Sequence, residues 1–199
     1  EKIRPCINCF VCVAQNFWNG EPVCAVNPRL GNYEEKIEVP KKLKNVVIVG
    51  AGPAGLECAR VASNRGHKVT LLEQTGSLGG TALFSSLTTP KNGELINWFE
   101  RILKDSEVVI RKNFLADSKS ILSFDPDVIV IATGSQSSKS NIKGAELPHV
   151  LSRDLLKALL QESDSSEVSK GRKNLSFLLL WLGRKSGLFK NVQKIRKLS

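Results

Sequence analysis

The chain of 199 residues contains no methionine, two histidines and one tyrosine, and it begins with Glu1. It also lacks a long apolar run, since the longest, FLLLWL, covers only residues 177–182. A membrane-spanning helix needs about 18 such residues. The N-terminus has no basic stretch followed by an apolar core, so no secretory signal is recognised. We therefore expect a cytoplasmic protein without membrane contact, and a piece of a larger or processed chain.

Acidic residues are absent from Val168 to Ser199, a segment with nine lysines and arginines. Removing these nine charges from the net charge of +10 leaves +1, so the rest of the chain is nearly neutral. Basic tails occur in chains that contact RNA, DNA or an anionic surface. No aromatic-rich RNA motif or zinc-finger spacing accompanies this one. A solvated tail is therefore favoured, and a nucleic-acid partner is not expected.

The sequence divides into three parts. Residues 1–39 show little helical or strand periodicity, so an irregular segment is expected there. Residues 40–150 begin with a polar connector at 40–45 and then alternate strand and helix patterns, which predicts a domain with an α/β fold and a parallel sheet. Strands are expected at 46–50, 68–73, 107–114 and 127–134, and helices at 53–66 and 93–105. Residues 151–199 predict a helix at 151–161, a polar linker, a further strand within 174–183 and the basic tail.

A glycine motif, GAGPAG, follows the first predicted strand and opens the first predicted helix. Alone, GxGxxG is a weak indication, but this position is typical of a dinucleotide-binding fold. Gly50 permits the tight turn, Gly52 lets the backbone approach a pyrophosphate, and Gly55 allows close packing of helix on strand. The amides at the helix N-terminus would face the phosphates. The predicted contact residues of this loop are Gly50, Ala51, Gly52, Pro53, Ala54 and Gly55.

Glu73 ends the second predicted strand, eighteen residues after Gly55. A carboxylate at this position is suited to accept both hydroxyls of an adenosine ribose, and it would repel a 2′-phosphate. FAD, NAD or ADP is therefore favoured over NADP as the ligand. The alternative is a surface glutamate that caps the strand and binds nothing.

Two later segments favour FAD over NAD. The first, QTGSLGGT, begins at Gln74. In the second, VIVIATGS, an apolar strand ends in an Ala-Thr-Gly turn. Both resemble the flavoprotein reductases that bind two dinucleotides, in which a glycine pair and an ATG turn border the flavin nucleotide. Without that resemblance, the ATG turn is equally well explained as an ordinary exit from a strand. The further predicted contacts are Gln74, Gly79, Gly80, Thr81, Thr133 and Gly134.

Four of the five cysteines fall within nineteen residues, at Cys6, Cys9, Cys12 and Cys24. Three interpretations compete. Disulfides suit a small secreted scaffold, and nothing here indicates secretion. Structural zinc commonly uses two separated pairs of ligands. Three closely spaced cysteines and one distant cysteine are typical of a [4Fe–4S] cluster, which the spacing therefore favours. The fifth, Cys58, lies in the first predicted helix and is expected to be a small buried residue.

Together these motifs carry a family resemblance. The iron–sulfur flavoenzymes contain segments similar to IRPCINCFVC, PVCAVNPRLG, KNVVIVGAGPAGLECAR, LLEQTGSLGG and VIVIATGS. They include 2,4-dienoyl-CoA reductase, trimethylamine dehydrogenase and related NADH:flavin oxidoreductases of the old-yellow-enzyme type. The resemblance covers residues 2–150 and implies a Rossmann-like FAD/NAD(P)-binding domain preceded by a [4Fe–4S] segment. The implied cluster ligands are Cys6, Cys9, Cys12 and Cys24. The implied neighbours of FAD or ADP are Gly50, Gly52, Gly55, Glu73, Gly80 and Thr133.

The resemblance also implies modules that this chain does not supply. Family members carry an N-terminal (β/α)8 barrel that binds FMN and acts on the substrate, and a second glycine-rich fold that binds NAD(P)H. Five residues precede the first cysteine of this chain, and residues 151–199 contain no second GxGxxG. The barrel is therefore expected in the full-length protein or another chain, and the NAD(P)-binding module is expected to be truncated or altered. No catalytic residue is assigned, because the family's catalytic residues lie in the barrel.

Two functions are compatible with these features. The favoured hypothesis is the electron-transfer part of an iron–sulfur flavoprotein oxidoreductase, with electrons passing between NAD(P)H, FAD, the cluster and FMN in the barrel. Such a part is not expected to turn over a substrate alone. The alternative is a non-catalytic module that binds ADP or FAD structurally, with a cluster or zinc site beside it.

Overall fold

The computed structural model describes residues 3–31, 38, 40–135, 142–145, 147 and 150. The chain divides into two compact units, residues 1–134 and 135–199, and the first contains the elements named below. The helix expected at 151–161, the strand expected within 174–183 and the basic tail lie outside the described residues. Within the described ranges, none of the helices combines the length and the apolar character that crossing a membrane requires.

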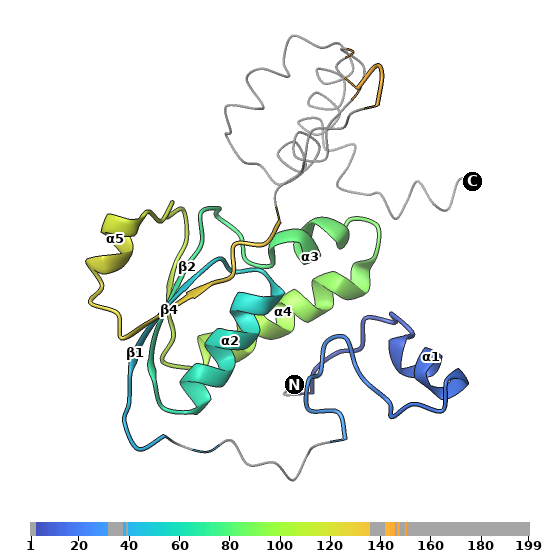
Figure 1. Ribbon diagram of the computed structural model, residues 1–199, viewed down its shortest axis with the longest axis horizontal. Helices are drawn as coiled ribbons and strands as arrows, with labels where there is room; N and C mark the ends of the chain where they lie inside the picture. Colours follow the sequence, from blue (N-terminus) through green and yellow to red (C-terminus); the bar gives the residue numbers. More distant parts are fainter. Residues whose placement is uncertain are drawn as a thin grey trace. The chain divides into compact units, whose positions relative to one another are not determined.

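A four-stranded parallel sheet forms the centre of the first unit, with the strand order β3-β2-β1-β4 (Figure 1). Its strands are β1 (Asn45–Val49), β2 (Lys68–Leu72), β3 (Val109–Arg111) and β4 (Val128–Ile131). This order is that of one half of a doubly wound, dinucleotide-binding sheet. The predicted α/β fold with a parallel sheet is therefore confirmed.

Helices α2 (Pro53–Asn64) and α4 (Pro90–Lys104) cover one face of the sheet. Figure 1 shows them together with α3 (Gly80–Ser85) on the same side of the strands. The buried core lies between this face and the helices, and it includes Ile48, Leu71, Leu56, Ala59, Leu95, Ile96 and Phe99. Trp98 of α4 is also buried, at 4% exposure. Its ring meets that of Phe99 edge-on, with centroids 4.9 Å apart.

Backbone chemistry sets both ends of α2. Gly52 precedes the helix in an extended conformation and Pro53 occupies its first position, where the missing N–H of proline costs nothing. Gly66 follows with φ +84, a left-handed conformation that glycine adopts readily and that ends the helix. The helix expected at 53–66 is thus confirmed, two residues shorter at its C-terminus.

Three short helices were not expected from the sequence: α1 (Val11–Phe17), α3 and α5 (Ser118–Leu122). None of them contains a buried residue, so no apolar stripe marks them in the sequence. The cysteine-bearing segment is therefore not wholly irregular, and that part of the expectation was wrong. Helix α5 has local support instead, since the Asp117 carboxylate accepts the N–H of Ser120 at 2.7 Å.

Candidate functional site

The loop after β1 is tightly packed at two of its glycines and open at the third. A Cβ atom on Gly50, which has φ +102, would lie 2.3 Å from the carbonyl oxygen of Ala132. A Cβ on Gly55 would lie 1.9 Å from the carbonyl oxygen of Gly50. A Cβ on Gly52 would meet no described atom within 4 Å. The fold itself requires glycine at two positions, whereas the third faces space that the phosphates of a ligand can enter.

Helix α2 starts at this open position. The N–H of Leu56 donates to the carbonyl oxygen of Gly52 at 2.9 Å, which is the first hydrogen bond of the helix. The amides before Leu56 have no partner within the helix, and the helix dipole adds a partial positive charge at this end. The open space at Gly52 therefore adjoins a group of atoms that attracts anions.

Glu73 is buried where β2 ends, with an exposed fraction of 7%. Its Oε2 accepts the N–H of Ala51 at 2.9 Å, and its Oε1 accepts the N–H and the hydroxyl of Thr75, both at 2.9 Å. An ionised carboxylate has about four acceptor positions, so these bonds leave one position, on Oε2. A single ribose hydroxyl can use it. Binding both hydroxyls, as the sequence predicts, requires one present bond to be exchanged.

The glycine pair Gly79 and Gly80 packs against the same loop. The N–H of Gly79 donates to the carbonyl oxygen of Ala51 at 2.8 Å. A Cβ on Gly80 would lie 3.2 Å from the Cα of Gly52. Both glycines have left-handed φ values, +107 and +52. The structure therefore brings the pair next to the glycine motif, and the following residue, Thr81, is exposed at the start of α3.

A cavity of about 100 Å³ opens at the carboxyl ends of β1 and β2. Four of the predicted contacts line it: Gly50, Glu73, Gln74 and Thr133. The other lining residues are Val49, Leu72, Phe114, Leu115 and Ala116. Four more predicted contacts are exposed and lie outside this lining: Pro53, Ala54, Thr81 and Gly134.

The segment 114–116 was missed by the sequence analysis because it carries no recognisable motif. Its position follows from topology, since it comes after β3 and the carboxyl ends of parallel strands meet at one edge of the sheet. Ligands of such sheets bind at that edge. The N–H of Phe114 donates to the carbonyl oxygen of Glu73 at 2.9 Å, which holds this segment beside the predicted ribose contact.

A larger and shallower hollow of about 460 Å³ lies between α4 and β3. Its lining includes the apolar residues Leu78, Leu103 and Ile110 and the basic residues Lys104 and Lys112. None of the contacts predicted from the sequence belongs to this lining. We assign the candidate site to the smaller cavity, because it joins the glycine loop to the buried carboxylate.

The cysteine segment, residues 6–24, carries four free thiols. The cysteines at positions 6, 9 and 12 are exposed, and Cys24 is half-buried. Asn8 and Phe10 have left-handed φ values of +56 and +59, and the N–H of Asn8 donates to the Cys6 sulfur at 3.3 Å. Free thiols with an amide directed at one of them suit a metal centre, because such hydrogen bonds tune metal-bound sulfur.

The donor set thus fits a cluster in its chemistry, but the thiols are not gathered. No three side chains of histidine, cysteine, aspartate or glutamate within the described ranges form a group that could hold a metal ion. The assignment of Cys6, Cys9, Cys12 and Cys24 as ligands stays a prediction.

Cys58 lies apart from the other cysteines, in α2, and packs against the core. Burial raises the pKa of its thiol, and the charge of the neighbouring Glu57 raises it further. A protonated, half-buried thiol agrees with the structural role expected for this residue.

A family model for pyridine nucleotide-disulphide oxidoreductases matches residues 29–89 and 44–168. The second match spans more than half of the chain and contains the glycine loop, Glu73 and Thr133. The chain belongs to this family. The cysteines at positions 6–24 lie outside both matched ranges, so the match concerns the nucleotide-binding part of this family member.

Curated relatives agree with this assignment. Cinnamate reductase of Clostridium sporogenes is 41% identical over 150 residues, which cover 73% of this chain and 23% of the reductase. NADH oxidase of Thermoanaerobacter brockii is 40% identical over 155 residues, with the same two shares. The chain thus spans about a quarter of the length of these curated relatives.

A solved structure agrees as well. The structure of 2-naphthoyl-CoA reductase in complex with 2-naphthoyl-CoA superposes with a TM-score of 0.69 at 31% identity. The match covers 79% of this chain and 24% of that reductase. These relatives confirm the resemblance to the iron–sulfur flavoenzymes of the dienoyl-CoA reductase and amine dehydrogenase type.

Proposed function

We propose that this chain is the electron-transfer part of an iron–sulfur flavoprotein oxidoreductase and binds FAD and a [4Fe–4S] cluster. One observation carries the proposal: open space at Gly52 adjoins the N-terminus of α2, and the Glu73 carboxylate is bonded to the same loop. This arrangement offers a place for phosphates and an acceptor for a ribose hydroxyl. The family match over residues 44–168 supports it.

The residues of this chain would bind and orient the nucleotide. The amides at the start of α2 would bind the pyrophosphate, and Gly52 would let the backbone approach it. Thr75 holds the Glu73 carboxylate in place through two hydrogen bonds, so that Oε2 faces the loop. Residues 114–116 line the cavity and would cover the adenosine portion. Bound FAD would supply two-electron chemistry with a nicotinamide and one-electron transfer to a cluster.

The proposed cluster ligands are Cys6, Cys9, Cys12 and Cys24. A [4Fe–4S] cluster would supply one-electron transfer, and its potential depends on hydrogen bonds to the sulfurs and on solvent exposure. The N–H of Asn8 already donates to the Cys6 sulfur. This amide would lower the electron density on that thiolate and thereby favour the reduced state.

Exposed apolar side chains on the cysteine segment favour the binding of a protein partner there. Exposed apolar side chains that cluster on a surface commonly mark an interface. Phe17 and Trp18 are each 80% exposed and Phe10 is 68% exposed, all within the segment that holds the cysteines. We propose that an FMN-binding (β/α)8 barrel, in the full-length protein or another chain, docks on this surface, with NAD(P)H as the electron donor. The relatives' fourfold greater length is compatible with such a domain.

A second candidate is a structural module that binds ADP without flavin chemistry. The cavity is compatible with it, because about 100 Å³ is less than the roughly 300–1,000 Å³ of typical ligand pockets, and ADP is the smaller ligand. Such a space suits part of an adenosine. In this case the phosphate and ribose contacts would be the same, and the isoalloxazine would be missing.

Anaerobic purification of the 199-residue chain, followed by iron and zinc analysis and identification of the nucleotide released by acid, separates these functions. FAD together with about four irons per chain supports the electron-transfer function. ADP with iron supports the second candidate. Zinc without iron overturns the cluster assignment, and failure to bind either FAD or ADP in titrations overturns the nucleotide site.

A further inference from the structure

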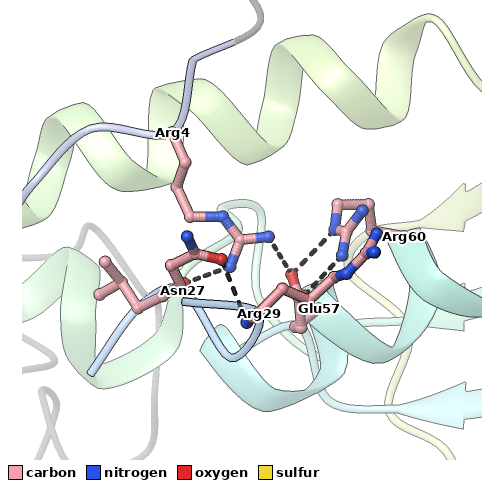
Figure 2. A network of polar contacts seen from close by, with 6 residues as sticks. Arg4, Asn27, Arg29, Glu57 and Arg60 are labelled. Atoms are coloured by element: carbon pink, nitrogen blue, oxygen red, sulfur yellow. Dashed lines mark hydrogen bonds and ion pairs between the residues drawn. The ribbon is translucent and has the colours of Figure 1, made fainter. Parts of the chain in front are cut away.

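One guanidinium group, that of Arg4, joins the cysteine segment to the nucleotide-binding domain (Figure 2). Its Nη2 donates to Oε2 of Glu57 in α2 at 2.8 Å, and its Nη1 donates to the carbonyl oxygen of Val26. Its central carbon lies 4.5 Å from the ring centroid of Trp98 in α4. The Arg4 side chain is 12% exposed. Arg4, which itself lies just before the cysteine segment, therefore contacts the backbone just after this segment and the helices α2 and α4.

The two positions joined by Arg4 flank the four cysteines. Arg4 precedes Cys6 by two residues, and Val26 follows Cys24 by two residues. The bond from Arg4 to Val26 thus closes the ends of the loop that bears the thiols. Closing a loop of about twenty residues removes conformational freedom that the open chain would have. Thiols on a closed loop have less entropy to lose when they gather around a metal.

Glu57 is the anchor of this link on the domain. It accepts two hydrogen bonds from Arg60 of the same helix, at 2.7 and 3.0 Å, in addition to the bond from Arg4. Burial raises the pKa of Glu57, but the hydrogen bonds and charges of Arg60 and Arg4 outweigh burial and hold the pKa below its ordinary value. The carboxylate is therefore ionised at neutral pH and balances charge beside both arginines.

The shape of the arginine side chain allows all of these contacts at once. Its planar fork can bind a carboxylate and a carbonyl oxygen in different directions while its face lies on an aromatic ring. The Trp98 ring lies under the Arg4 guanidinium, and the Phe99 ring is 5.6 Å from it. A lysine has one point charge at the end of its stem and cannot make all of these contacts together.

We propose that Arg4 is a positioning residue that fastens both ends of the cysteine segment to α2 and α4 through Glu57 and Trp98. The fastening itself is a property of the protein without any ligand. Its consequence for metal, which rests on the proposed function, is that it preorganises the four thiols and slows loss of the cluster.

The fastening is tested on the metal-free 199-residue chain by amide hydrogen exchange over residues 3–31. In Arg4→Gln the exchange should be about tenfold faster or more, because a charged hydrogen bond and a stacking contact are lost. Arg60→Gln is the matched control: Arg60 is also 12% exposed and binds the same carboxylate, but contacts no residue of the cysteine segment in the described hydrogen bonds. It should change exchange by less than about twofold. Arg4→Lys should lie between wild type and Arg4→Gln.

Equal exchange in wild type and Arg4→Gln would overturn the fastening, and so would an equal acceleration in Arg60→Gln. Thermal unfolding of the same variants shows whether the domain is intact. If Arg4→Gln unfolds the domain, the Arg4→Lys variant decides: the proposal then requires faster exchange over 3–31 with an unchanged melting temperature. None of these measurements needs a cluster.

The metal consequence is tested on iron-loaded protein. The rate at which a chelator removes iron should rise about tenfold in Arg4→Gln and stay near that of wild type in Arg60→Gln. The electron paramagnetic resonance spectrum of the reduced protein should broaden in Arg4→Gln alone. Equal chelation rates would overturn preorganisation. A wild-type chain that takes up no iron would sink the cluster assignment, while the exchange result for Arg4 would stand.

Discussion

The side-chain carboxylate of Glu73 and the backbone amide of Ala51 form a hydrogen bond of 2.9 Å across the edge of the sheet. This bond joins the end of β2 to the second residue of the glycine motif, 22 residues earlier in the chain. A single side chain therefore helps to hold the glycine loop in place, and in the proposed function it would also accept a hydrogen bond from a ribose hydroxyl. The proposed function thus makes structure and ligand binding depend on the same carboxylate.

The Glu73→Gln variant tests both roles, and an exposed glutamate serves as the control for the loss of one negative charge. A glutamine must turn its NH2 group toward either Ala51 or Thr75, where the present partners are donors. We expect a loss of about 1–3 kcal/mol in the free energy of unfolding and a loss of ADP affinity in calorimetric titration. Glu100→Gln is the control, because Glu100 is exposed and lies 4.0 Å from Lys112. Unchanged stability in Glu73→Gln would show that the buried bonds are unimportant.

Alanine substitutions at two glycines of the loop should affect different properties, ligand binding in one case and folding in the other. In Gly52→Ala the new methyl group meets no described atom, so the free energy of unfolding should change by no more than about 1 kcal/mol. The nucleotide affinity should fall at least about tenfold, because the methyl group occupies the space needed by phosphate. In Gly55→Ala the methyl would lie 1.9 Å from the Gly50 carbonyl oxygen, so folding should be lost. Urea denaturation and ADP titration measure both. Normal ADP binding by Gly52→Ala would contradict the assigned phosphate position.

The parallel sheet and the glycine loop could be predicted because their signals are local. A short β-branched run, a glycine turn and a helix with an apolar stripe lie next to one another between residues 45 and 64. The stripe on α4 was equally visible, because its buried positions recur at helical spacing.

The features that sequence analysis missed depend on contacts between distant residues or on local geometry. Segment 114–116 reaches the site only because β3 pairs with β2. Arg4 and Glu57 are 53 residues apart, and neither the cysteine spacing nor the GxGxxG pattern indicates that they meet. Helix α1 buries no side chain, so nothing in its composition distinguishes it from the expected irregular segment. Such features require the fold to be known first.

The lowered pKa of Glu57 predicts how stability depends on pH. Because the folded protein holds this pKa below its ordinary value of 4.5, the ionised carboxylate stabilises the folded state above that pH. The stabilisation is lost as pH falls below 4.5 through the folded-state pKa. Glu57→Gln should therefore cost about 1 kcal/mol near neutral pH, and the difference from wild type should shrink as the pH falls.

Guanidinium denaturation at pH values from neutral to acid measures this dependence, with Glu100→Gln as an exposed control. Guanidinium chloride is itself a salt and screens ion pairs, so a second series uses urea, which is uncharged. A difference between Glu57→Gln and wild type that stays constant down to acid pH would mean that the carboxylate is not stabilised by Arg4 and Arg60.

Replacing single cysteines tests the proposed ligand set against a control within the same chain. Cys9→Ser removes an exposed thiol from the cysteine segment, whereas Cys58→Ala removes a half-buried thiol packed on the core. Losing a ligand should reduce affinity for iron by about 100-fold or more, so Cys9→Ser should purify with little iron and without the absorbance of a cluster. Cys58→Ala should keep its iron and lose a small amount of stability, because a half-buried side chain packed on the core is shortened. Full iron content in Cys9→Ser, measured beside an unchanged melting temperature, would remove Cys9 from the ligand set and would leave too few cysteines in this segment for four-cysteine ligation.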